Sequence, residues 1–79
     1  MTMDRFCVNV MCLVGGVWSS IQNPNFVEGD FDLELTFNDM FRHNLGRNPT
    51  DAEVYDFKSK KEISIDDREI TYIFYYETI

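Results

Sequence analysis

The sequence predicts an α+β fold: one domain, residues 1–79, in which a mainly antiparallel sheet of four to five strands carries two short helices on one face. Several segments alternate apolar and polar residues, which is the period of a β-strand. A helical period of apolar residues interrupts this series once, after residue 37. Strands on both sides of a helical insert favour an antiparallel sheet with the helices packed against it.

The first two predicted strands form a hairpin. Residues 5–14 are rich in β-forming side chains and apolar on both faces, which predicts a central strand covered on both sides. Gly15-Gly16 is a strong signal for a two-residue turn, and residues 17–22 follow as the return strand. The polar segment 22–25 then ends the hairpin.

Residues 31–37 show the cleanest alternation in the chain, and we expect them to form the third strand. The apolar side comprises Phe31, Leu33, Leu35 and Phe37, and the polar side comprises Asp32, Glu34 and Thr36. A strand with this pattern has one buried and one wet face.

Two short helices are predicted next. The first has its apolar face at Phe37, Met40, Phe41 and Leu45. Thr36 or Asn38 would be its N-cap, and Gly46 lies where a glycine commonly ends a helix. Thr50 and Glu53 have the spacing of a capping box, which opens a second helix with Val54 and Phe57 on its buried side.

Residues 63–65 and 69–76 are predicted as the last two strands, joined at residues 66–68. The longer strand places Ile70, Tyr72, Phe74 and Tyr76 on one face and Thr71, Ile73 and Tyr75 on the other. The complete predicted order is therefore β-β-β-α-α-β-β.

The two cysteines indicate a reducing compartment. Cys7 and Cys12 lie five residues apart in the first strand, so they face opposite sides and cannot pair there. Unpaired cysteines are typical of cytoplasmic proteins, and we expect a cytoplasmic location, in the host cell if the chain is phage-encoded. The apolar run 6–17 is shorter than the roughly 20 residues of a membrane-spanning helix, so no membrane partner is expected.

No residue pattern indicates catalysis or a cofactor. His43, the one histidine, lies off the apolar face of its predicted helix, and zinc would need more Cys or His ligands. A catalytic pair of His43 with Cys7 or Cys12 stays open but has no supporting motif. We expect no enzyme activity, no cofactor and no metal.

The turn between the predicted helices has one family resemblance. Residues 45–53, Leu-Gly-Arg-Asn-Pro-Thr followed by Glu53, resemble the turn between helices in the DNA-contacting regions of bacterial sigma factors. That resemblance implies a DNA-reading second helix. The helix, however, begins with Asp51 and Glu53 and carries Asp56, which phosphate groups repel. We interpret the segment as helix capping and expect no direct binding to nucleic acid.

Acidic side chains are the feature that indicates a function. The chain has 14 Asp and Glu against 7 Lys and Arg, a net charge of −7. Glu28, Asp30, Asp32 and Glu34 alternate, so on a strand they would project from one face about 7 Å apart. Asp39 would extend this field if the helices lie nearby. The row is either a solvated strand face that protects a sheet edge or a DNA mimic that occupies a basic groove.

We therefore expect a non-enzymatic protein that binds and blocks a larger protein with a basic nucleic-acid-binding surface. Small size and acidic charge resemble phage-encoded anti-defence proteins, such as anti-CRISPR or anti-restriction factors. The alternative is a homo-oligomer, such as a homodimer, or an accessory subunit that uses an exposed sheet face without an inhibitory role. The aromatic group predicted for such a face is Trp18, Tyr72, Tyr75 and Tyr76, because Tyr and Trp are favoured at interfaces. The predicted partner-binding residues are Glu28, Asp30, Asp32, Glu34, Asp39 and Tyr75.

Overall fold

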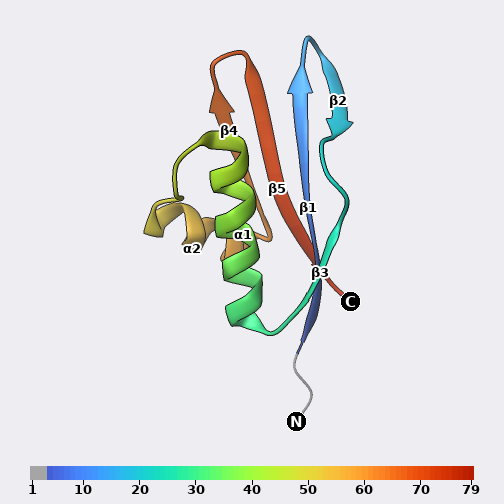
Figure 1. Ribbon diagram of the computed structural model, residues 1–79, viewed down its shortest axis with the longest axis vertical. Helices are drawn as coiled ribbons and strands as arrows, with labels where there is room; N and C mark the ends of the chain where they lie inside the picture. Colours follow the sequence, from blue (N-terminus) through green and yellow to red (C-terminus); the bar gives the residue numbers. More distant parts are fainter. Residues whose placement is uncertain (1–3) are drawn as a thin grey trace.

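The computed structural model describes residues 4–79. Five strands form one sheet, and two helices lie together on one side of it (Figure 1). Every strand pairing is antiparallel, and the elements follow the order β1–β2–β3–α1–α2–β4–β5. The predicted α+β class, the order of the elements and the antiparallel sheet are therefore confirmed.

β1 (Arg5–Val14) lies inside the sheet and has the predicted bounds. On one side it pairs with β5 (Ile70–Thr78), and β4 (Glu62–Asp67) forms the edge beyond β5. On the other side it pairs with β2 (Val17–Ser20) and with β3 (Asn25–Glu28). Gly15 and Gly16 join β1 to β2 with φ values of +57° and +81°, the region that this hairpin turn requires.

The strand predicted at residues 31–37 is wrong, because α1 spans Asp30–Leu45 and contains the whole segment. The third strand is β3, which lies earlier in the chain. Over the sixteen residues of α1, the side chains at 33, 37, 40 and 41 share one helical face and are buried. This longer helical period outweighs the alternation of residues 31–37. The predicted N-caps Thr36 and Asn38 are consequently inside the helix, and Gly29 is the N-cap.

The predicted ends of the helices are otherwise confirmed. Gly46 ends α1 with a φ of +73°, and its N–H donates to the Arg42 carbonyl at 2.8 Å. α2 spans Asp51–Lys60 and opens with a complete capping box. The Glu53 N–H donates to Thr50 Oγ1 at 3.2 Å, and the Thr50 N–H donates to Glu53 Oε1 at 2.8 Å. Within residues 4–79, neither helix has the length and apolar character needed to span a membrane.

The core lies between the two helices and one face of the sheet. Phe37 of α1 stacks on Phe57 of α2 with ring centroids 4.1 Å apart. It also packs nearly perpendicular to the Phe74 ring of β5, with ring centroids 5.7 Å apart. The buried side chains are Phe6, Val8, Val10, Cys12, Leu33, Phe37, Met40, Phe41, Phe57, Tyr72, Phe74 and Tyr76. Because both helices contribute to this one cluster, they are fixed on the same side of the sheet.

The opposite face of the sheet is covered by neither helix of the described chain, which corrects the prediction that β1 is covered on both sides. Along β1, the side chains that face the helices are buried and those that face the other way are half-buried. Cys12 faces the core and Cys7 faces the other side, and both are free thiols. An apolar strand indicates two covered faces only when the chain supplies a layer for each, and here both helices belong to one layer.

Candidate interaction surfaces

The predicted row of acidic side chains is not formed. Glu28 ends β3, whereas the other four predicted acids lie on α1. On a helix, residues four apart share a side and residues two apart do not. Asp30 and Glu34 therefore project together toward α2, and Asp32 projects away from them. The phosphate-like spacing expected along a strand is wrong, because it depended on the strand.

Lys58 of α2 neutralises part of the acidic charge on α1. Its Nζ donates to Asp30 Oδ2 at 2.7 Å and to Glu34 Oε2 at 3.3 Å. The hydrogen bond to Asp30 is the main reason that the pKa of Lys58 is raised above its usual value. Asp39 pairs with Arg42, one turn further along α1, at 3.0 Å. Only Glu28 and Asp32 among these five acids have no ion pair with another residue of the range 4–79.

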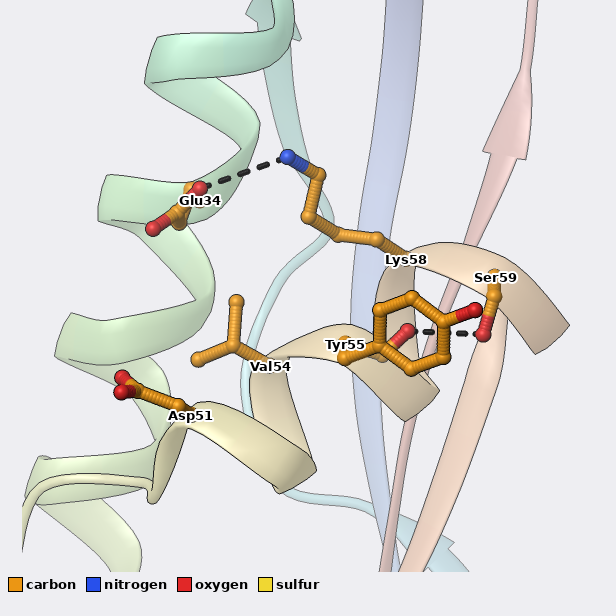
Figure 2. A pocket seen from close by; sticks show the side chains of 6 residues that line it. All are labelled: Glu34, Asp51, Val54, Tyr55, Lys58 and Ser59. Carbon is orange, nitrogen blue, oxygen red and sulfur yellow. Dashed lines mark hydrogen bonds and ion pairs between the residues drawn. The ribbon is translucent and has the colours of Figure 1, made fainter.

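A groove lies between the two helices, with a volume of about 540 Å³. Figure 2 shows Lys58 extending from α2 toward Glu34 on α1, with Val54 between the helices and Tyr55 at the outer side. We call the exposed sides of α1 and α2 around this groove the helical surface. The lining carries both signs of charge, with Glu34 and Asp51 on the acidic side and Lys58 on the basic side.

The helical surface also carries exposed apolar side chains. Phe31 and Leu35 of α1 are 73% and 45% exposed, and Tyr55 of α2 is 71% exposed. The sequence-based strand placed Phe31 and Leu35 on a buried face together with Phe37. The helix instead turns both of them outward, so the structure adds them to the candidate binding residues.

The second candidate surface is the sheet face opposite the helices, which we call the open face. Strand register fixes its members, because directly paired residues point to the same side of a sheet. Met11 pairs with Ile73, and Asn9 pairs with Tyr75. The side chains of its centre are Cys7, Asn9, Met11, Leu13, Trp18, Phe26, Thr71, Ile73 and Tyr75.

The predicted aromatic group is divided between the two faces of the sheet. Tyr75 and Trp18 lie on the open face, whereas Tyr72 and Tyr76 are buried in the core. Burial is also the main reason that the pKa of Tyr76 is raised, and its hydroxyl donates to the Lys58 carbonyl. Trp18 is 45% exposed, and Phe26, which was not among the predicted residues, is 72% exposed. The open face is therefore apolar at its centre and accessible at Trp18 and Phe26.

Acidic side chains border the open face. Glu62 and Asp66 of the edge strand β4 lie beside Tyr75 and Thr71, and Thr71 Oγ1 donates to Asp66 Oδ1 at 2.7 Å. Glu77 of β5 lies beside Cys7, and Glu28 of β3 lies beside Arg5. We call Glu28, Glu62, Asp66 and Glu77 the acidic rim. Of these four acids, only Glu28 was among the predicted partner-binding residues. The alternation of side chains along the last two strands was the signal for the others.

The residues considered for catalysis lie on different elements of the described chain. His43 is exposed on α1, and the sheet lies between it and Cys7 on the open face. Cys12 faces the core, with its Sγ 3.5 Å from Ser19 Oγ. Within residues 4–79, no three His, Cys, Asp or Glu side chains are grouped as metal ligands would be.

Comparisons with known proteins give no family for this chain. It matches no protein-family model, no curated protein and no solved structure at a significant level.

Proposed function

We propose that this protein is a non-enzymatic inhibitor or adaptor that binds and blocks a larger, cationic, nucleic-acid-binding protein in the cytoplasm. The observation that carries the proposal is negative charge that the chain does not neutralise itself. Of the 14 acidic side chains, five form ion pairs within residues 4–79, and Lys58 alone serves two of these. The other nine have no such pair.

Unneutralised charge of one sign destabilises a compact chain through self-repulsion. It also accelerates association with a surface of opposite sign and disfavours partners of like sign. A protein that binds nucleic acid presents Lys and Arg side chains to phosphate groups, so it offers the complementary surface. If this protein occupies that surface, nucleic acid is excluded from it.

The regular spacing of a DNA backbone is not part of the proposal, because the acids on α1 and β3 do not form a row. The proposal requires only a net negative surface that competes with nucleic acid. Phage anti-defence inhibitors, including anti-CRISPR and anti-restriction factors, are the class that fits this size and charge.

A competition experiment tests the function. The tagged chain is expressed in the cells in which it occurs, its bound protein is identified, and a complex of that protein with labelled nucleic acid is titrated with the chain. We expect the nucleic acid to be released with an end point at a fixed molar ratio. We also expect the affinity of the chain to fall as salt increases, because its surface charge is screened.

Variants of opposite effect on net charge provide the control. Glu62→Gln with Glu77→Gln removes two negative charges and should weaken displacement, whereas Lys60→Gln with Lys61→Gln removes two positive charges and should not. Simultaneous binding of the chain and the nucleic acid would contradict the proposal. Capture of only acidic proteins would contradict it as well.

A further inference from the structure

We propose that the open face is the surface that binds this partner, and that the partner's surface has an apolar centre surrounded by Lys and Arg side chains. The inference rests on the proposed function, to which it adds an interface and the chemistry of the occupant.

The centre of the open face is largely apolar, with Asn9 and Thr71 as its polar members, and it has no layer above it within residues 4–79. Met11, Leu13 and Ile73 are half-buried only by their neighbours in the sheet. Trp18 and Phe26 stand at the side formed by β2 and β3, exposed by 45% and 72%. Contiguous apolar surface with exposed aromatic side chains is typical of protein interfaces, where such side chains contribute most of the binding energy.

The charge of the acidic rim indicates which kind of partner fits the open face. Glu28 lies at one edge of the sheet, and Glu62 and Asp66 lie at the other, so acids border the apolar centre on both sides. Arg5 is the basic residue that the strand register places among them. In a face-to-face dimer of this chain, each edge would meet an acidic edge of the second copy. Like charges in an interface oppose association, so the charge pattern fits a partner with a basic rim and not a second copy.

The helical surface also carries exposed apolar side chains, but most of the acids of its two helices are already paired within the described chain. Lys58 and Arg42 lie among its acids and already pair with Asp30, Glu34 and Asp39. A cationic partner would have to compete with these internal ion pairs. Apart from Arg5, which lies opposite Glu28, the register places no Lys or Arg beside the acids of the open face, so a partner's cations would meet less internal competition there.

Site-specific photo-crosslinking locates the interface. Tyr75→p-benzoylphenylalanine places the reactive group on the open face, and Tyr55→p-benzoylphenylalanine places it on the helical surface as the matched control. Both variants are irradiated in the native cells. We expect position 75, and not position 55, to form an adduct with the protein that wild-type chain captures, through a segment that contains Lys or Arg beside apolar residues.

Charge reversal tests the rim on the purified complex. Glu62→Lys with Glu77→Lys should weaken binding by about tenfold or more, because it places cations opposite cations. Asp39→Lys with Asp56→Lys makes the same change in net charge on the helical surface. Its affinity should stay within about threefold of wild type, because charges more than about 8 Å apart are screened at physiological salt. Equal losses in the two variants would overturn the role of the rim.

The remaining outcomes separate this inference from the proposed function. An adduct from position 55 alone would overturn the open-face interface while leaving a cationic partner in place. An adduct between two copies through position 75, with a dimer in sedimentation at micromolar concentration, would overturn the inference in favour of self-association. Failure of both positions and of wild-type chain to capture a cationic protein would overturn the function itself.

Discussion

Two segments with the same alternating pattern adopt different structures. Residues 31–37 form the first half of α1, and residues 70–76 form most of β5. In β5, alternate residues divide between the core and the open face, as the pattern predicts. In α1, Leu33 and Phe37 are buried whereas Phe31 and Leu35 are exposed, so the apolar set is divided instead of sharing one face.

Composition and context explain the difference. Residues 70–76 consist entirely of β-branched and aromatic residues, which favour strands. Residues 31–37 include Asp32 and Glu34, which are uncommon in strands, and Leu33 and Leu35, which favour helices. Acids in the first turn also interact well with the positive end of a helix. Alternation is therefore a reliable strand signal only when the residue types agree with it.

The largest expected effect comes from truncating Phe37, the last residue of the alternating segment of α1. Phe31, the first residue of that segment, provides the control. Phe37 is fully buried, so Phe37→Ala should lower the free energy of unfolding by about 3–5 kcal/mol. Phe31 is 73% exposed, so Phe31→Ala should change it by no more than about 0.5 kcal/mol. Urea denaturation measures both. On a strand the two rings would share one face, so similar losses would contradict the helix.

A smaller effect is expected at the residue where β3 ends and α1 begins. Gly29 has φ +90° and ψ 156°, a region that is essentially restricted to glycine. Its N–H donates to the Asp4 carbonyl at 2.8 Å, and its carbonyl accepts from the Leu33 N–H at 3.1 Å. Gly29→Ala should therefore destabilise the protein by about 1–3 kcal/mol.

Gly46→Asn is the control for this substitution. Gly46 has φ +73° and ψ 11°, a left-handed conformation that asparagine tolerates. Its loss of stability, measured by the same denaturation, should be clearly smaller. If both variants lost the same amount, the conformation of Gly29 would not be what determines the start of α1.

The smallest effect tests where the acids of α1 point. Glu34 contacts Lys58 and Asp32 does not, although a strand would place both acids on one face. A double-mutant cycle of Lys58→Met with Glu34→Gln should give a coupling of about 0.2–1 kcal/mol, because the pair is partly exposed. The cycle with Asp32→Asn should give none. Equal coupling of Lys58 to both acids would contradict the helix and favour a strand for this segment.

The same ion pairs predict a pH dependence. Hydrogen bonds to Asp30 and Glu34 raise the pKa of Lys58 above its usual 10.5. A raised pKa means that the contribution to stability is complete below about pH 10.5 and is lost as pH rises through the folded value. The difference in stability between wild type and Lys58→Met should therefore shrink in that alkaline range. A constant difference would contradict the charge interaction.

Local features of the fold could be predicted because they depend on a few neighbouring residues. The Gly15-Gly16 turn, the capping box at Thr50 and the alternation of β5 each follow from the conformational preferences of adjacent side chains. The position of Tyr75 on the sheet face opposite Tyr72 and Tyr76 was predictable for the same reason. The acidic row was not, because its geometry was derived from an incorrect element.

By itself the sequence determined the chain's negative charge, its class of fold and the side of β1 and β5 on which each residue lies. Only the tertiary structure decided that Asp30 and Glu34 meet Lys58, and that one apolar sheet face is covered while the other is open. The physical reason is that burial depends on where the two helices dock. Their docking follows from Leu33, Phe37, Phe41 and Phe57 filling one shared core, and no local pattern contains that information.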